Sequence, residues 1–326
     1  MKKTLVALAA LAVMGAASAQ STVTLYGMID TAFVHTTETN KASKNAIDSG
    51  TIGTSKFGFK GSEDLGGGLK ANFKLEQAIK SDTGAATAGT AFSREAWVGL
   101  SGGFGQVKLG KVSSAYNDIE SAAGALWGSG VLGPIGLVFE SDLQEDARPK
   151  NTIYYATPTF SGVTGSVSYS MDEAAGGSTV KSLGLAYEQG PLYVGAGYQA
   201  QQAFGSAVEV QLSQLNATYD LTSVKLLGAL GRVANSNGVT GDTATEWQIG
   251  VDVPVSSALT VSAGYASSTT DFLAAGAADA KHTAFSVGGK YALSKRTFAF
   301  AGIASAKLDT TNVTVNTYAF GINHTF

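Results

Sequence analysis

The sequence of 326 residues contains no cysteine, five prolines and three histidines. The absence of cysteine excludes a disulfide scaffold and a zinc site of the cysteine type. The chain beyond its N-terminal segment has no apolar run of 18 residues or more, which excludes a helical membrane protein. Charged residues make up only 14 %, whereas soluble domains have about 25 %. The composition therefore fits neither a helical membrane protein nor an ordinary soluble domain.

The N-terminus has the pattern of an export signal. Lys2 and Lys3 precede an apolar run over residues 4–14, and Ala17-Ser18-Ala19 forms a small-residue cleavage site. We therefore predict a signal peptide over residues 1–19 and a mature chain over residues 20–326. Loss of the two lysines leaves 20 basic against 25 acidic side chains, a net charge of −5, which argues against a nucleic-acid partner.

The stretch LGGGLKANFKLEQAI at residues 65–79 shows the pattern that recurs along the mature chain. Apolar side chains such as Phe73 and Leu75 alternate with hydrated ones such as Lys74 and Glu76. A period of two predicts a β-strand with one apolar and one polar face. We find sixteen such segments, at residues 22–34, 54–61, 68–79, 91–101, 104–110, 150–156, 163–170, 180–188, 191–199, 208–219, 222–232, 243–253, 259–267, 281–291, 297–306 and 315–326.

The connections between these segments alternate between short turns and long loops. An even number of antiparallel strands with turns at one rim and loops at the other is typical of an outer-membrane barrel. Along 247–253, Trp247, Ile249 and Val251 alternate with polar residues or glycine. We therefore predict an all-β fold, a closed antiparallel 16-stranded transmembrane barrel with lipid outside and water inside. Aromatic residues near strand ends, Trp97 among them, are expected in the interfacial girdles.

Several stretches resemble the Gram-negative general porin family, in particular its β-proteobacterial branch. They are VTLYGMID (23–30), SKFGFKGSEDLGGGLKANFKLE (55–76), FSREAWVGLSGGFGQVKLGK (92–111), FSGVTGSVSY (160–169) and YAFGINHTF (318–326). The resemblance implies a homotrimer of barrels in the outer membrane, each with its own pore, in contact with lipid and lipopolysaccharide. It also implies that the terminal Phe326 is the signal read by the barrel-assembly machinery.

The longest connection, residues 111–149, is predicted to be the constriction loop. By the resemblance it is the third extracellular loop, folded into the barrel at mid-height. Its glycines let it bend, and its apolar residues can anchor it on the inner wall. Its candidate constriction acids are Asp118, Glu120, Glu140 and Asp142, while Glu145 and Asp146 are alternatives that could lie at the mouth.

A basic inner wall is predicted opposite this loop. Alternation against lipid-facing neighbours places four lysines of three segments in the lumen, and Arg94 is assigned there because it has the parity opposite to Trp97. Arg148 and Lys150 are placed where the loop rejoins the wall. In the resembled family, constriction arginines occupy positions similar to Lys56, Arg94 and the Arg148/Lys150 pair. The full predicted set is Lys56, Lys60, Lys74, Arg94, Lys108, Arg148 and Lys150.

The function that follows is passive diffusion of small inorganic ions and hydrophilic solutes through a water-filled pore. Cations on one side and carboxylates on the other would create a transverse field. Because the charges nearest the constriction are mainly basic, we expect a weak anion preference. A substrate-specific channel is the alternative. An outer-membrane enzyme is disfavoured, since the chain has only three histidines and each is interpreted as an ordinary surface or rim residue. No cofactor or metal site is expected.

Overall fold

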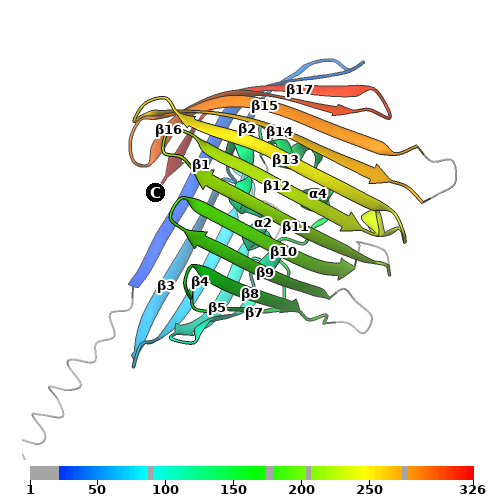
Figure 1. Cartoon of the computed structure of the whole chain (residues 1–326). Helices are drawn as coiled ribbons and strands as arrows, with labels where there is room; N and C mark the ends of the chain where they lie inside the picture. Colours follow the sequence, from blue (N-terminus) through cyan, green and yellow to red (C-terminus); the bar gives the residue numbers. More distant parts are fainter. Residues whose placement is uncertain (1–21, 87–90, 129, 174–178, 203–206, 274–277) are drawn as a thin grey trace, which may run out of the picture.

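The computed structural model describes residues 22–86, 91–128, 130–173, 179–202, 207–273 and 278–326. In these ranges the chain forms one antiparallel sheet of seventeen strands that closes on itself (Figure 1). The predicted signal peptide lies outside the described residues. The strands are β1 (Thr22–Glu38), β2 (Lys44–Ser49), β3 (Lys56–Gly66), β4 (Leu69–Ala78), β5 (Glu95–Gly102), β6 (Gly105–Lys111), β7 (Thr152–Ala156), β8 (Val163–Ser170), β9 (Val180–Gln189), β10 (Leu192–Gln202), β11 (Glu209–Asp220), β12 (Lys225–Ala234), β13 (Thr243–Pro254), β14 (Leu259–Asp271), β15 (Ala280–Ala292), β16 (Thr297–Leu308) and β17 (Val313–Thr325).

Closure occurs between the first and last strands. β1 pairs with β17 from Met28↔Thr325 to Glu38↔Val315. The backbone of Phe326 exchanges two further hydrogen bonds of 3.0 Å with Gly27. Within the described residues, β1 and every strand from β3 to β17 pair on both sides, as a span through hydrocarbon requires, while β2 pairs only with β1.

The number of strands exceeds the predicted sixteen because the second strand is broken. β2 pairs with the C-terminal half of β1 and β3 with its N-terminal half, so the two pieces together occupy one place in the barrel. The buried carboxylate of Asp30 holds the break, accepting hydrogen bonds from the backbone N–H groups of Thr51 (2.7 Å) and Ile52 (3.4 Å) and from Asn323 Nδ2 (2.9 Å). The prediction that residues 35–53 form only a loop is therefore wrong.

The two faces of the strands divide as the alternation predicts. Val98, Leu230 and Ile249 are each about 58–59 % exposed on the outside, while Gln214 and Gln248 are buried inside. An outward apolar surface of this kind fits a hydrocarbon surrounding. No helix in the described part of the chain is both long and apolar enough to cross a membrane.

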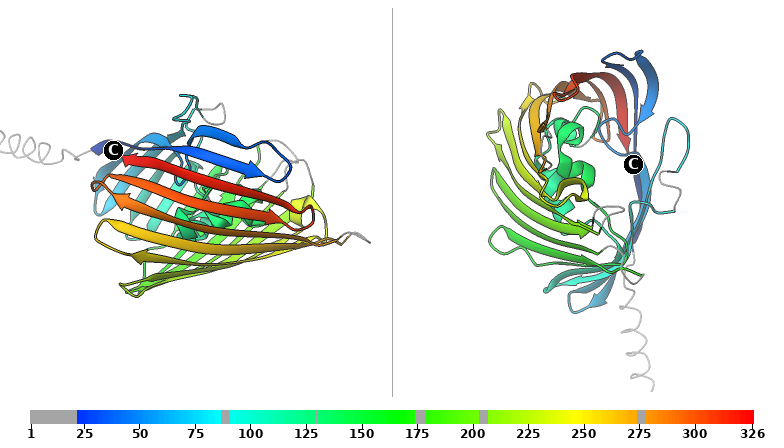
Figure 2. Two further views of the ribbon diagram at one scale, coloured as in Figure 1. Left: turned by 90° about the horizontal axis from the view of Figure 1, so that it is seen from above. Right: turned by 90° about the vertical axis from the view of Figure 1, so that its right-hand side faces the viewer.

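The connection after β6 lies inside the barrel, as the end-on view of Figure 2 shows. It contains α2 (Ala115–Glu120), two short 3-10 turns η2 (Ser121–Ala123) and η3 (Ala125–Trp127), α3 (Pro134–Val138) and α4 (Glu140–Gln144). We call residues 112–149 the inner loop. Its helices contact strands from β8 to β16, which leaves the inner faces of β3 to β6 on the other side. A single turn, η4 (Ser236–Gly238), lies between β12 and β13.

Candidate functional site

The inner face of β3 and β4 carries a compact group of charges around one carboxylate. Glu76 is only 2 % exposed and accepts hydrogen bonds from Arg94 Nε at 2.6 Å and from Tyr26 Oη at 2.8 Å. Lys74 Nζ lies 3.4 Å and Lys56 Nζ 3.9 Å from its oxygens. The structure thus brings three of the predicted basic residues together, and we call these residues the Glu76 cluster.

The strand register explains why these side chains meet. Gly58 lies opposite Glu76 and Lys60 opposite Lys74, so the even-numbered positions of β3 and β4 share the inner face. Gly58 is required there, because a Cβ would lie 2.5 Å from the carbonyl oxygen of Leu75 and 2.8 Å from Tyr26 Oη.

The prediction that Trp97 belongs to a lipid-facing girdle is wrong. β5 begins at Glu95, and its outward positions include Val98, so Trp97 faces inward, where Nε1 donates a hydrogen bond of 2.7 Å to Glu95 Oε2. Arg94 precedes the strand, so alternation does not decide its direction. The prediction placed Arg94 inside because its parity is opposite to that of Trp97, and this reason does not apply, since Trp97 itself faces inward.

Two further lysines of the predicted set lie against aromatic rings. Lys60 Nζ is 5.2 Å from the ring centroid of Tyr26, and Lys108 Nζ is 4.4 Å from Tyr154 and 5.2 Å from Trp97. Among the described residues, neither ammonium group has a carboxylate within 4.0 Å. Ring faces attract these cations without neutralising them, so both remain free to attract an anion.

A hollow of about 260 Å³ lies on this side of the lumen. It is bordered by β1, β3, β4, β5 and β6 near the rim with short turns. It is lined by Thr22, Thr24, Lys60, Gly61, Ser62, Asn72, Phe73, Lys74, Trp97 and Gln106.

The inner loop is seated on the opposite wall through small residues. Ile135, Val138 and Phe139 are at most 1 % exposed and pack on alanines at positions 229, 266 and 284. A Cβ at Gly250 or Gly264 would lie 2.5–2.6 Å from the Cβ of Ala125 in η3, so only glycine permits this approach.

Polar side chains of the wall fix the backbone of the inner loop. Glu246 accepts hydrogen bonds from Ser141 N (3.0 Å) and Ser141 Oγ (2.6 Å). Gln248 Nε2 donates to the carbonyl of Ala123 at 2.8 Å, and Gln201 donates to that of Gln144 at 2.6 Å. These groups satisfy backbone that is enclosed by protein, as buried polar groups require.

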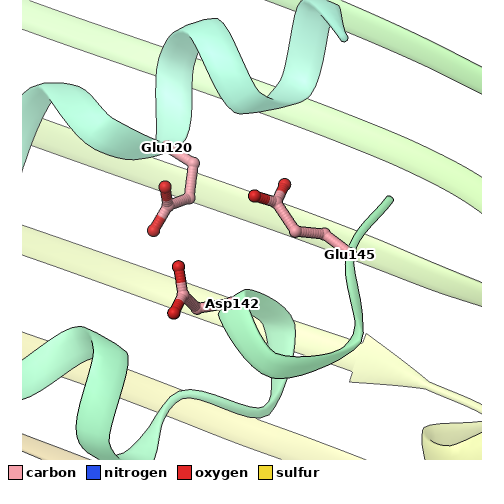
Figure 3. A group of neighbouring side chains, drawn as sticks. All are labelled: Glu120, Asp142 and Glu145. Atoms are coloured by element: carbon pink, nitrogen blue, oxygen red, sulfur yellow. The ribbon is translucent and has the colours of Figure 1, made fainter. Parts of the chain in front are cut away.

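The four predicted constriction acids occupy three different environments. Asp118 reaches across to the basic side, where its Oδ2 accepts a hydrogen bond of 2.8 Å from Tyr154. Glu120 and Asp142 come together with Glu145, as Figure 3 shows. Glu140 accepts a hydrogen bond of 2.9 Å from Gln144 Nε2 on its own helix.

The two basic residues at the end of the inner loop also separate. Arg148 is partly buried, and its pKa is lowered by burial and then by the positive charge of Arg94, so it lies next to the Glu76 cluster. Lys150 lies at the rim, 3.8 Å from Glu173, and both side chains are more than two-thirds exposed. Lys150 is therefore not part of the group around Glu76.

The sequence reasoning missed Glu76 and Glu95 as members of the basic wall. Lys74 Nζ lies 2.6 Å from Glu95 Oε1, so the wall is a network of both signs. The alternation that placed Lys74 inside also applies to Glu76 and could have identified it. The small wall residues under the inner loop were harder to identify. Their only sign in the sequence is alanine or glycine at strand positions where alternation predicts a polar side chain that faces the lumen.

Comparison with known proteins agrees with this architecture. The profile of the family described as Gram-negative porin matches residues 4–311. The chain is 36 % identical over 277 residues to outer membrane porin protein 32 of Delftia acidovorans, covering 78 % of this chain and 76 % of that protein. It is 32 % identical over 275 residues to an outer membrane porin protein of Bordetella pertussis, covering 72 % of this chain and 70 % of that protein.

Among solved structures, the anion-selective porin from Comamonas acidovorans superposes with a TM-score of 0.81 at 26 % identity, covering 94 % of this chain and 100 % of that one. The barrel, its inward loop and these relatives lead to one conclusion: the chain belongs to the Gram-negative porin family, of the β-proteobacterial branch, and is a porin of the outer membrane.

Proposed function

We propose that ions and small hydrophilic solutes diffuse through this porin between the Glu76 cluster and the inner loop, across a transverse electric field. The observation that carries the proposal is the gathering of Lys56, Lys74 and Arg94 on one inner wall while the inner loop covers the other. Asp118 of the inner loop accepts a hydrogen bond from Tyr154, whose ring lies next to Lys108. The proposed constriction therefore uses both walls.

The field follows from the separation of the charges. The inward charges of β3 to β6 are cationic in excess, because Glu76 and Glu95 face five basic groups, namely Lys56, Lys60, Lys74, Arg94 and Lys108. The acids Asp118 and Glu140 belong to the inner loop. Fixed charges of opposite sign orient water and separate the paths of anions and cations.

A weak anion preference is the expected result. Charges within the Debye length, about 8 Å at physiological ionic strength, act more strongly than the net charge of distant loops. The structural relative from Comamonas acidovorans is named as anion-selective. That relationship supports a preference for anions in this porin as well.

A double neutralisation tests the proposal. The variant Lys56→Gln/Arg94→Gln should lower the chloride-to-potassium permeability ratio, measured by reversal potential in planar bilayers. The variant Lys44→Gln/Lys295→Gln removes the same charge from exposed positions outside the cluster and should have little effect. A clear cation preference of the unmodified protein, or equal shifts in both variants, would contradict the proposal.

We also propose that the mature chain assembles as a homotrimer after removal of residues 1–19, in contact with lipopolysaccharide, and that Phe326 directs insertion by the barrel-assembly machinery. Membership in a family of channels supports this, as does the backbone pairing of Phe326 with Gly27, which makes the last residue part of the closed barrel. Native mass spectrometry should give three chains per particle, and deletion of Phe326 should lower the amount inserted. The same membership supports a channel rather than an enzyme, with no cofactor.

A substrate-specific channel is the second candidate, favoured by one observation. Tyr26 and Trp97 present rings to the lumen beside Lys60 and Lys108. Rings with adjacent ammonium groups could select an anionic solute that also has an apolar face. Conductance that saturates with one such solute would favour this candidate, whereas flux that rises linearly for solutes of similar size would favour general diffusion.

A further inference from the structure

Three carboxylates from separate parts of the inner loop lie close together inside the barrel. Glu120 ends α2, Asp142 lies on α4, and Glu145 follows that helix; Figure 3 shows all three side chains directed toward one another. One oxygen from each lies within 4.8 Å of the others. Glu120 is only 4 % exposed. We call this group the acid triad.

The charges of the acid triad are not balanced by an ion pair. Among the described residues, no lysine, arginine or histidine nitrogen lies within 4.0 Å of these three carboxylates. Arg148 is the nearby cation whose charge acts on Glu120 and Glu145. Glu246, buried on β13, adds a further acid close to Glu120. Like charges this close in protein surroundings repel strongly.

Buried polar atoms without partners surround the same point. Glu145 Oε2 is inaccessible to solvent and has no hydrogen-bond partner among the described residues, although its carboxylate is directed into the triad. Within the described part of the chain the hydroxyl of Tyr116 also has no hydrogen-bond partner, and the Tyr116 side chain is 0 % exposed. Tyr116 lies on α2, the helix that ends at Glu120, and burial and then the charges of Glu145 and Glu120 raise the pKa of Tyr116. Because buried polar groups are normally satisfied, these atoms indicate an occupant.

We propose that Glu120, Asp142 and Glu145 bind one divalent cation, with Ca²⁺ preferred over Mg²⁺. Carboxylate oxygens are the ligands that both ions use. Two oxygens bound to one Ca²⁺ at about 2.4 Å can be up to about 4.8 Å apart, so oxygens that all lie within 4.8 Å of one another can share one ion. Mg²⁺ requires near-ideal octahedral geometry and gives up its water reluctantly, whereas Ca²⁺ accepts the irregular arrangement of three carboxylates from separate parts of a loop. Water supplies the remaining ligands.

The ion has a clear mechanical role in this position. α2 belongs to the outgoing arm of the inner loop, and α4 with Glu145 belongs to the returning arm. Without a cation the three carboxylates repel one another and push the two arms apart. A cation bound by all three holds the arms together. The site lies within the inner loop and does not depend on the selectivity proposed above.

The test is a binding experiment on the mature chain, refolded in detergent without lipopolysaccharide and freed of metal by chelator. Tb³⁺ should bind with luminescence sensitised by Tyr116, one ion per chain, and Ca²⁺ should displace it at lower concentration than Mg²⁺. Tyr116→Phe should lose most of the luminescence while Ca²⁺ binding, measured by calorimetry, persists. Circular dichroism checks that each variant retains the barrel.

Neutral variants locate the site. Glu120→Gln, Asp142→Asn and Glu145→Gln should each weaken Ca²⁺ binding at least about tenfold, because each removes one charged ligand. Asp146→Asn is the matched control, since this exposed side chain adjoins Glu145 but lies outside the triad, and it should change affinity by less than about twofold. Absence of saturable binding, or equal binding by all four variants, would overturn the proposal and leave protons as the only occupants.

Discussion

Replacing Glu76 by Gln should increase the anion preference of this porin. The carboxylate lies 2.6 Å from Arg94 Nε, 3.4 Å from Lys74 Nζ and 3.9 Å from Lys56 Nζ, so it offsets part of the charge of three cations. Gln can still accept the hydrogen bond from Tyr26, and only the charge is removed. The barrel should still form, because the side chains of the three cations keep 17–25 % exposure.

The expected size of the effect follows from Coulomb's law. A unit charge acts on an ion about 6 Å away with about 0.7 kcal/mol at a dielectric constant of about 80. Loss of the negative charge favours an anion by this amount and disfavours a cation equally. The difference of about 1.4 kcal/mol corresponds to about a tenfold change in the permeability ratio. Screening reduces it, so about 0.1 M salt or less is needed.

The assay is the reversal potential of single channels under a KCl gradient. Glu76→Gln should move it toward the chloride potential, and Arg94→Gln should move it the opposite way. Glu63→Gln makes the same chemical change at an exposed position near the end of β3 and should have little effect. A shift of Glu76→Gln toward potassium, or one no larger than that of Glu63→Gln, would refute the assignment of Glu76 to the ion path.

Three further outcomes are expected. Asp30→Ala should lower stability by about 2–4 kcal/mol in urea unfolding, because it leaves the donors of residues 51, 52 and 323 without an acceptor; Asp64→Ala in an exposed turn should cost under about 1 kcal/mol. Gly133→Val should displace the inner loop and raise single-channel conductance, since a Cβ there would lie 1.6 Å from a backbone oxygen, whereas Gly103→Val meets open space and should conduct normally. The third outcome concerns amide hydrogen exchange of α2 and α4, measured with chelator present and corrected for intrinsic exchange rates. Exchange should become faster from pH 5 to pH 9, because burial and then the charge of Asp142 raise the pKa of Glu120 to about 8. A raised carboxyl pKa means that the folded loop holds protons it loses as pH rises, so stability falls in that direction, and exchange that slows with pH would contradict the sign.

Alternation of side chains was sufficient to predict the barrel, because lipid and water impose opposite demands on successive residues of one strand. Alternation did not predict β2 or the break before β3, because both depend on contacts between distant segments. Lys44–Ser49 forms a strand because β1 extends to Glu38 and offers it a partner, and the break before β3 depends on Asp30, a contact between distant segments. Neither the length of β1 nor the contacts of Asp30 can be read from the alternation of neighbouring residues.

The candidate site was predictable only in part, for the same reason. Parity placed Lys56 and Lys74 inside, but their convergence on Glu76 depends on the register between β3 and β4. The acid triad joins residues that are 22 and 25 positions apart from Glu120 in sequence, and the path of the inner loop brings them together. No short motif signals such a site, which is why no metal ligand was expected there.

The inner wall is divided between two tasks, and this division explains why the proposed field can be transverse. Strands β8 to β16 supply small or amide side chains that seat the inner loop, while β3 to β6 supply the wall cations. Strand pairing fixes the positions of the wall cations, so their spacing cannot change without changing the barrel register. The acids of the inner loop are held by side-chain contacts such as Ser141 with Glu246. Substitutions in the inner loop can therefore alter selectivity while the barrel pairing stays the same.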